Sequence, residues 1–337
     1  MAGTETTAAR RVVELITGTW RAQALHAAAA LSLPDHIAAG HGTVSALADR
    51  TGANEDALAR LTRLLAALGV LAGDEEHGYR LTEVGALLTG DGEQSMRDMV
   101  LLYGEEFHRA WGAVVPAVRS GTSGFAHAHG VSLHTYLREQ PGAGPRFLRA
   151  MNAGNVFFPE VAAAFDFTRA QSVVDVAGGS GLLLAAVLKA HTHLRGTVFD
   201  LPHMLPVAER YLGDVVDSGR YETVAGDIFD KVPAGHDVYL LSRVLQDWDD
   251  EHCATLLANI REAMPGSGRL LVLDRVIATE GEPPVLPLLW DLHLLMAAGG
   301  RERTLDGYRS VLHAAGLRLE STHALSLETT LLVAAPL

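Results

Sequence analysis

In the second half of the chain, short apolar runs alternate with longer segments whose apolar residues recur three or four positions apart. The short runs are rich in β-branched residues, which is typical of strands buried in a parallel sheet, and the longer segments have the spacing of amphipathic helices. This alternation predicts a doubly wound α/β sheet from about residue 172 onward. The predicted strands are 173–177, 196–200, 221–226, 237–242 and 269–276.

The final part of the chain departs from this alternation. Helical spacing over 286–298 and 305–316 is followed by two apolar runs, Arg318–Ser326 and Thr329–Ala335. The two runs lie close enough in sequence to pair as a hairpin. We therefore expect an antiparallel last strand.

The first part of the chain predicts mostly short helices. A helix–turn–helix around Gly52–Asn54 is followed by two short strand-like runs, which is the order of a winged helix. Its second helix, Ala57–Leu68, is largely apolar and offers few side chains for reading bases, which favours a structural or dimer-forming role over DNA binding. Residues 96–165 also show helical spacing and are relatively rich in aromatic side chains. We predict three parts, 1–95, 96–165 and 166–337.

The composition narrows the partners. The chain has 337 residues and a formal net charge of -13, with no Lys/Arg-rich run, so nucleic acid and anionic membranes are not expected partners. The most apolar stretches are too short or too interrupted for a spanning helix. Cys253 is the only cysteine, and the first residues lack a basic segment followed by an apolar core, so the cytoplasm is the expected location.

A glycine-rich turn follows the first predicted strand and carries the first chemical signal. Glycines at the carboxyl end of a buried strand, as at Gly178–Gly181, let the backbone approach a ligand. Asp200 ends the next strand roughly 20 residues on, the distance at which an acid in a βαβ unit reaches ribose hydroxyls. A dinucleotide fingerprint would need a glycine where Leu184 stands, which disfavours pyrophosphate binding. Asp227 and Phe229, after the third strand, could bind and stack on an adenine.

The segment Asp175–Gly181 resembles the first motif of class I S-adenosylmethionine (SAM) methyltransferases, acid-x-G-x-G-x-G, with Ala177 in the first glycine slot. Together with Val224–Phe229, Val244–Asp250 and Gly299–Thr304, it makes the chain similar to the plant-type small-molecule O-methyltransferase family, which includes bacterial natural-product members such as the mitomycin enzyme. The resemblance covers nearly the whole chain. It implies a class I SAM methyltransferase sheet preceded by a winged-helix dimerisation domain, and hence a homodimer.

The resemblance also implies the cofactor and its site. SAM would be the methyl donor, S-adenosylhomocysteine the product, and no metal would take part. The glycine turn would lie along the methionine part, Asp200 would hold the ribose, and Asp227 with its two successors would surround the adenine. The implied cofactor residues are Asp175, Gly178, Gly179, Gly181, Asp200, Leu201, Gly226, Asp227, Ile228, Phe229, Ser242 and Arg243.

One position departs from the family in a way that concerns the chemistry. The family segment Leu-His-Asp-Trp supplies a histidine that takes the proton from the acceptor hydroxyl, and here that position is Gln246. A neutral amide cannot act as a general base near pH 7. The two acids that flank the histidine have counterparts in Asp274 and Glu302. His293, on a segment that lines the acceptor pocket in the family, is a candidate replacement base.

Losing the histidine does not exclude methyl transfer. The reaction is a displacement at an activated methyl group, so alignment of the reacting atoms can supply much of the rate. A base matters little when the acceptor is an acidic phenol, a carboxylate or an amine with a free lone pair, and Gln246 would then orient it by hydrogen bonds. The candidate acceptor-binding residues are Phe147, Met151, Asn152, Trp248 and Met296.

The sequence therefore predicts a SAM-dependent enzyme that methylates an oxygen of an aromatic secondary metabolite. N-methylation of an aromatic heterocycle is the nearest alternative. Another alternative is a tailoring enzyme that binds SAM without transferring its methyl group. A ligand-sensing DNA-binding regulator is the remote alternative, and the acidic balance argues against it.

Overall fold

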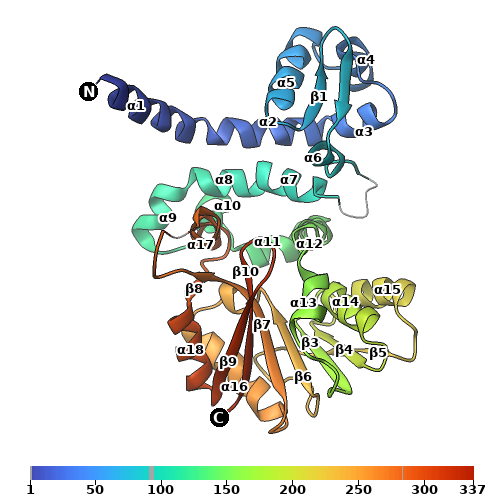
Figure 1. Cartoon of the computed structure of the whole chain (residues 1–337), viewed down its shortest axis with the longest axis vertical. Helices are drawn as coiled ribbons and strands as arrows, with labels where there is room; N and C mark the ends of the chain where they lie inside the picture. Colours follow the sequence, from blue (N-terminus) through green and yellow to red (C-terminus); the bar gives the residue numbers. More distant parts are fainter. Residues whose placement is uncertain (1, 91–94, 283) are drawn as a thin grey trace. The chain divides into compact units, whose positions relative to one another are not determined.

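The computed structural model describes residues 2–90, 95–282 and 284–337, with side chains from Thr7 onward (Figure 1). The chain divides into two compact units. One comprises the residues up to Arg109 together with Gln140–Gly154, and the other comprises Ala110–Glu139 together with Asn155–Leu337. The helices between residues 97 and 164 are thus shared between the two units. No helix in the described ranges is long and apolar enough to cross a membrane.

The first unit contains the predicted helix–turn–helix and its two-stranded wing. Side-chain oxygens of Thr43 and Asn54 accept backbone N–H bonds and so cap the two helices, while Gly52 takes the left-handed conformation that ends the first of them. The wing strands pair antiparallel. The elements are α1 (Ala2–Ile16), α2 (Gly18–Ala30), α3 (Leu33–Ala38), α4 (Val44–Thr51), α5 (Glu55–Ala67), β1 (Leu71–Asp74), β2 (Gly78–Leu81), α6 (Glu83–Ala86), α7 (Arg97–Gly104) and α12 (Ala143–Ala153).

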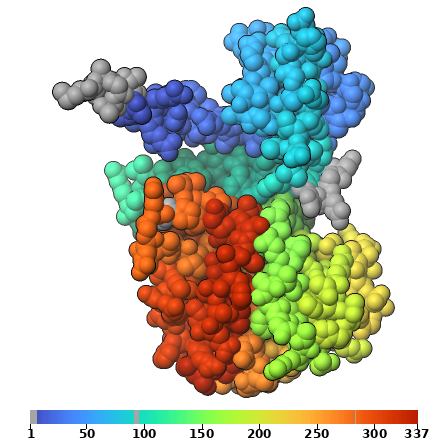
Figure 2. Space-filling view, in the orientation of Figure 1, coloured from blue at the N-terminus to red at the C-terminus, as the bar shows by residue number. Residues whose placement is uncertain are grey.

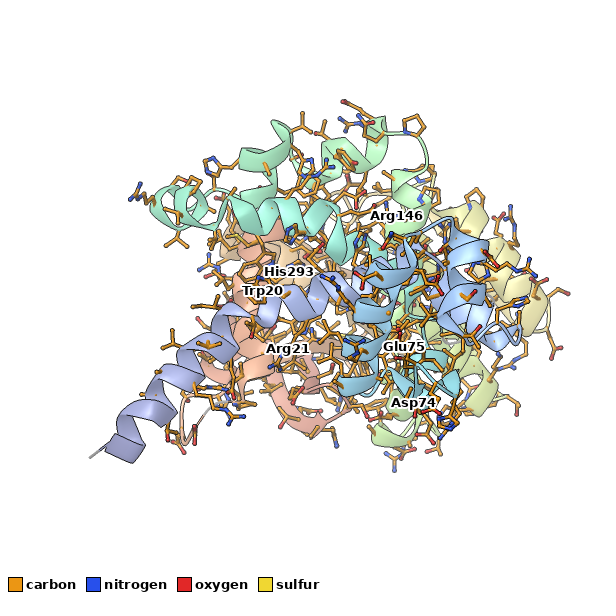
Figure 3. The ribbon with its side chains drawn as sticks, turned by 90° about the horizontal axis from the view of Figure 1, so that it is seen from above. Trp20, Arg21, Asp74, Glu75, Arg146 and His293 are labelled. Atoms are coloured by element: carbon orange, nitrogen blue, oxygen red, sulfur yellow. The ribbon has the colours of Figure 1, made fainter. Side chains whose placement is uncertain are left out.

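Ion pairs attach α12 to the rest of this unit. Arg146, labelled in Figure 3, donates to Glu105 at 2.7 Å and to Glu106 at 3.1 Å. Arg149 donates to Asp98 on α7 at 2.6 Å. The segment 140–154 therefore belongs to the first unit through charge as well as packing.

The second unit is the predicted doubly wound sheet. Its strand order is β5-β4-β3-β6-β7-β10-β9, with a short β8 paired to β7, and along the main path only β10 runs antiparallel to the other strands. The predicted strands are present with ends shifted by one or two residues, and the antiparallel last strand is confirmed. The strands are β3 (Ser172–Val176), β4 (Arg195–Asp200), β5 (Tyr221–Ala225), β6 (Val238–Ser242), β7 (Arg269–Ile277), β8 (Arg303–Thr304), β9 (Leu317–Ala324) and β10 (Thr329–Pro336).

Helices pack on both faces of this sheet, and the sheet separates two apolar cores. Successive residues of β3 alternate between them, with Val173 in one core and Val174 in the other, as the two-residue period of a strand requires. Figure 2 shows the chain after β9 against α13, where the Ser326 N–H donates to Glu160 at 3.0 Å. The helices are α8 (Glu106–Gly112), which begins in the first unit, then α9 (Val114–Ser120), α10 (Gly124–His129), α11 (Leu133–Glu139), α13 (Phe158–Ala164), α14 (Leu182–Ala190), α15 (Leu205–Val215), η1 (Leu245–Asp247), α16 (Asp250–Ala263), α17 (Val285–Ala297) and α18 (Leu305–Ala314).

The order of the sheet locates its binding edge. β3 lies between β4 and β6, so the connections run outward in opposite directions from it. In such sheets a crevice forms outside the carboxyl ends of the strands at this switch point. The glycine turn after β3 and the acids that follow β4 and β5 all lie at that edge.

Candidate active site

The turn after β3 is shaped by three residues in the left-handed conformation. Ala177, Gly179 and Gly181 have φ values of 55°, 56° and 75°. A side chain at Gly178 would come within 2.9 Å of the Asp175 carboxyl carbon. The sequence therefore needs glycines here for conformation and for close approach, and Ala177 adopts a conformation that costs a non-glycine residue about 1–2 kcal/mol.

Asp200 fixes this turn. Its Oδ2 accepts the Gly179 N–H at 2.8 Å, and its Oδ1 accepts the Leu201 N–H at 2.7 Å. Burial raises the pKa of Asp200, and these two backbone donors oppose the rise. The structure thus brings together three of the predicted cofactor residues, from β4 and the turn after β3.

Two buried polar atoms at the same edge have no hydrogen-bond partner among the described residues. They are Oδ2 of Asp175, on β3, and Oγ of Ser242, at the end of the neighbouring β6. Burial raises the pKa of Asp175 to about 7, with the Asp200 charge adding to the rise. A buried polar atom costs free energy until something bonds to it, so these atoms suit a site that receives a polar ligand.

The residues after β5 form the other side of this edge. Gly226 is required because a side chain there would meet the Phe199 ring at 2.4 Å. Asp227 is exposed, with Oδ1 accepting the Phe229 N–H at 2.9 Å, and the Ile228 carbonyl accepts from the Asn259 amide at 2.9 Å. The loop is therefore held by one hydrogen bond of its own and by one from α16.

Phe229 belongs to a cluster of rings. Its edge meets Trp248 with centroids 4.8 Å apart, and Trp248 stacks on His252 at 5.4 Å and on His134 at 5.9 Å. Trp248, predicted to touch the acceptor, thus lies beside a residue that the resemblance assigns to the adenine. His252 is exposed at the start of α16.

A second group of polar residues lies on the segment after β6, within β7 and just before β8. Gln246 is on the one-turn helix η1 and is 8% exposed. No described residue donates a hydrogen bond to its Oε1. Gln246 therefore presents a buried acceptor atom at the position where the resembling family has its base.

Three carboxyl groups share this environment. Burial raises the pKa of Asp247 to about 6, and the Arg243 charge and a hydrogen bond from Gln246 oppose it. Burial raises the pKa of Asp274 to about 7, opposed by the Tyr308 hydroxyl, which donates to its Oδ2 at 3.2 Å.

Glu302 is the most perturbed of the three. Burial raises its pKa to about 9, and the Asp274 charge adds to the rise while Arg275 opposes it. Neither oxygen of Glu302 accepts a hydrogen bond from the described part of the chain, and Arg275 Nη1 lies 4.0 Å away. Its carboxyl group is therefore protonated near pH 7 and can donate a hydrogen bond as well as accept one.

His293 is buried on α17 and has a defined partner (Figure 3). Its Nδ1 accepts the Trp111 indole N–H at 3.1 Å, and the two rings stack. Burial lowers the pKa of His293 to about 4, so the ring is neutral. Because Nδ1 accepts, the proton of the neutral ring sits on Nε2, and in this arrangement His293 offers a donor rather than a proton acceptor.

The remaining predicted acceptor residues belong to both units. Phe147, Met151 and Asn152 are on α12 in the first unit, and their role stays a prediction. Met296 is fully buried on α17 and packs against Gly124 of α10, where an added Cβ would lie 2.8 Å from its sulfur.

Several residues of this region were not singled out from the sequence. Arg275 lies over the Trp290 ring, 4.6 Å from its centroid, and Arg303 is buried within the Glu302 motif. Asp247 and Arg303 stood inside recognised motifs, which is a signal that could have found them. Trp111 and Tyr308 carried none.

Comparison with known proteins decides the family. The O-methyltransferase domain family matches residues 111–318, and the O-methyltransferase dimerisation domain family matches residues 13–91. The chain belongs to the SAM-dependent O-methyltransferase family. These matches confirm the fold, the cofactor and the class of reaction that the motifs of this O-methyltransferase indicated.

Similar proteins cover nearly the whole methyltransferase. It is 44% identical to 3-amino-4-hydroxybenzoate 4-O-methyltransferase of Streptomyces cremeus, over 97% of this chain and 90% of that one. Phenazine-1-carboxylate N-methyltransferase of Pseudomonas aeruginosa is 42% identical, with 97% of each chain covered. The solved structure of the mitomycin 7-O-methyltransferase MmcR matches with a TM-score of 0.90 and 34% identity, covering 100% of both chains.

The residues of the binding edge fit SAM. The left-handed turn gives the backbone close access, Asp200 is already oriented by two amides, and two buried polar atoms await partners. Over residues 2–90, 95–282 and 284–337, no group of three or more His, Cys, Asp or Glu side chains could hold a metal ion.

Proposed function

We propose that this methyltransferase acts on an aromatic acceptor whose nucleophilic oxygen is already ionised, or acidic enough to ionise in the site. Gln246 and the acids around it would bind and orient this acceptor without removing its proton. Bound SAM supplies an electrophilic methyl group, which becomes bonded to the acceptor oxygen as the carbon–sulfur bond breaks. Any proton on the acceptor leaves to solvent beforehand.

The single observation that carries this proposal is the buried Oε1 of Gln246, to which no described residue donates. An amide oxygen accepts a hydrogen bond but does not take a proton near pH 7. Gln246 is thus suited to bind a donor group on the acceptor and unsuited to activate a weakly acidic hydroxyl.

The neighbouring acids also support a site that binds the acceptor without removing its proton. The raised pKa values leave Glu302 protonated near pH 7 and Asp274 about half protonated. A protonated carboxyl group can donate to an anionic oxygen, which favours binding a phenolate or a carboxylate. We propose that Gln246, Asp274 and Glu302 position the acceptor, with His293 donating through Nε2.

The test compares the natural enzyme with Gln246→His on phenols graded in acidity, using labelled SAM and beginning with 3-amino-4-hydroxybenzoate. We expect the natural enzyme to turn over only the acidic phenols. The histidine variant should gain the weakly acidic ones by roughly 10²-fold or more, since a general base contributes about 10²- to 10⁴-fold. Gln246→Asn, which keeps an amide but shortens its reach, is the control.

Efficient methylation of weakly acidic phenols by the natural enzyme would contradict the proposal. Turnover of an acceptor with SAM bound but without S-adenosylhomocysteine would indicate the non-methylating alternative instead.

N-methylation is the second candidate, and the N-methyltransferase of Pseudomonas aeruginosa at 42% identity favours it. An amine with a free lone pair needs no base, so the Gln246 argument holds equally for nitrogen. Mass spectrometry of the product formed from 3-amino-4-hydroxybenzoate, which offers both nucleophiles on one ring, separates the two candidates.

We further propose a cytoplasmic homodimer with the predicted parts 1–95, 96–165 and 166–337, in which Phe147, Met151, Asn152, Trp248 and Met296 contribute to the acceptor pocket. The match to a dimerisation domain over residues 13–91 supports the dimer. Several large apolar side chains are also exposed on α1 and α2, among them Trp20 at 65% (Figure 3). Light scattering after gel filtration tests whether the protein is a dimer. Substituting each pocket residue by alanine and measuring the KM for the acceptor tests the pocket assignment.

A further inference from the structure

The turn that carries Gln246 is held by a side chain far along the sequence. Arg303 Nη1 donates to the Leu245 carbonyl at 2.7 Å, and Nη2 donates to the Trp248 carbonyl at 2.8 Å. These two carbonyls stand on either side of Gln246 and Asp247. The guanidinium group thus spans the whole one-turn helix η1.

The other end of the same guanidinium group is anchored at the start of α16. Nη2 and Nε of Arg303 donate to Oδ1 of Asp250 at 2.7 and 3.1 Å. The Arg303 side chain is 5% exposed, whereas that of Asp250 is 61% exposed. A planar fork with several donors can satisfy all these acceptors at once, and a lysine ammonium cannot reproduce that geometry.

The backbone beside Arg303 holds the same turn a second time. The Arg301 N–H donates to the Gln246 carbonyl at 2.8 Å, and a side chain on Gly300 would lie 2.2 Å from that oxygen. Glu302 lies in sequence between Arg301 and Arg303, which make these contacts. Its own N–H donates to Asp291 on α17 at 2.8 Å. The spacing between Gln246 and Glu302 is therefore set by contacts that include Arg303.

We propose that Arg303 is a positioning residue for methyl transfer, which fixes Gln246 relative to Glu302 without touching the acceptor. The inference rests on the proposed function of these two residues. Its expected signature is a lower kcat with little change in SAM affinity, because most of the implied cofactor residues lie at β3, β4, β5 and the turns after them, and none lies on η1. A misplacement of about 1 Å can cost about 10²-fold in rate.

Arg220 provides a matched control in the same unit. It too uses its guanidinium group on backbone carbonyls, donating to Leu188, His191 and Leu194 at 2.8, 2.8 and 3.1 Å. These carbonyls belong to the end of α14 and the loop before β4, at the opposite edge of the sheet from the binding crevice. Arg220→Lys therefore reports what losing such a clamp does to stability alone.

The experiment measures Arg303→Lys, Arg303→Ala and Arg220→Lys with labelled SAM and 3-amino-4-hydroxybenzoate, together with SAM affinity by calorimetry. We expect Arg303→Lys to lower kcat by about 10- to 100-fold with SAM affinity within about threefold. Guanidinium ion at millimolar concentration should partly restore the alanine variant, and ammonium ion should not. Arg220→Lys should keep kcat within about twofold. Equal losses of kcat in both lysine variants, or no rescue by guanidinium, would overturn the proposal.

A second readout works even if the natural enzyme methylates no acceptor, an outcome that would count against the proposed function only. Hydrogen exchange of peptides covering residues 244–250 should become faster in Arg303→Lys and stay unchanged in Arg220→Lys. Unchanged exchange at 244–250 in Arg303→Lys would show that the arginine does not hold this turn.

Discussion

The proposed site has two ends, a cofactor end around Asp200 and an acceptor end around Gln246, and the two ends are built in different ways. At the cofactor end, backbone groups do most of the work, since the Asp200 carboxylate accepts two amide N–H bonds and Gly179 and Gly181 shape the turn. At the acceptor end, side chains dominate, and atoms of Gln246, Asp274 and Glu302 are buried without hydrogen bonds from the described residues.

The difference teaches how each end tolerates change. A site made of backbone groups depends on the conformation of the chain. Most substitutions that leave the conformation of the turn unchanged therefore leave the site intact. A side-chain site depends on the identity of a few residues and on the contacts that aim them. The family can therefore keep its cofactor while Gln246 stands in the place of a histidine.

A matched pair of glycine substitutions should separate the two ends most strongly. In Gly300→Ala the new Cβ would meet the Gln246 carbonyl at 2.2 Å, and in Gly226→Ala it would meet the Phe199 ring at 2.4 Å. We expect Gly300→Ala to lower acceptor kcat/KM by about 100-fold and to leave SAM affinity nearly unchanged. Gly226→Ala should instead weaken SAM binding by at least about tenfold, equal to about 1.4 kcal/mol. Calorimetry and steady-state kinetics measure both, and a loss of SAM binding in Gly300→Ala would erase the distinction.

The buried acids of the acceptor end should appear in the pH dependence of stability. The pKa of Glu302 is raised from 4.5 to about 9, so its stabilising contribution is complete below pH 4.5 and is lost as the pH rises through 9. Relative to Glu302→Gln, the natural protein should therefore lose free energy of unfolding between pH 6 and pH 9.

Urea unfolding at the two pH values measures this difference. Asp227→Asn, which removes an exposed charge at the cofactor end, controls for the loss of one negative charge. A constant gap between the natural protein and Glu302→Gln would mean that Glu302 ionises normally.

The smallest effect is expected from a substitution at Ala177, which occupies the first glycine position of the motif, and it concerns the free energy of unfolding. Ala177 has φ of 55°, and glycine would relieve that conformation at the price of a more flexible unfolded chain. We expect Ala177→Gly to stabilise the protein by about 0.5–1 kcal/mol. Ala185→Gly in the buried face of α14 should instead destabilise it by about 1 kcal/mol. Destabilisation of both variants would mean that the Ala177 methyl group contributes more by packing than it costs in conformation.

The strands and the glycine turn at the cofactor end could be predicted from the sequence, whereas the roles of the individual residues there stay a prediction. Three of the parallel strands have an acid or a glycine at or next to their carboxyl ends: Asp175 is penultimate in β3, Asp200 is last in β4, and Gly226 follows β5. The predicted strands and the hairpin lie within one or two residues of their observed positions. At this edge, the type of a residue and its place at the end of a strand both point to the same candidate ligand-binding position.

The acceptor end could be predicted only as a set of motifs. The hydrogen bond between Trp111 and His293 joins residues 182 positions apart, and nothing near either residue signals it. Two of the hydrogen bonds of Arg303 go to backbone carbonyls, which every residue type has, so the sequence does not mark these partners. Side-chain identity can suggest such residues, but their partners follow only from the folded arrangement.

The place of β10 in the sheet has a consequence for the order in which the enzyme folds. Thr329–Pro336 is the last strand in sequence, yet it lies inside the sheet between β7 and β9. During synthesis the parallel strands can pair as they emerge, but β9 cannot join the sheet until β10 has been made. The segment that carries Glu302 and Arg303 lies within the loop that this late pairing closes. On a growing chain the acceptor end is therefore completed after the cofactor end. A substitution that weakens the pairing of β10 would then lower activity because the segment with Glu302 and Arg303 would not be assembled correctly.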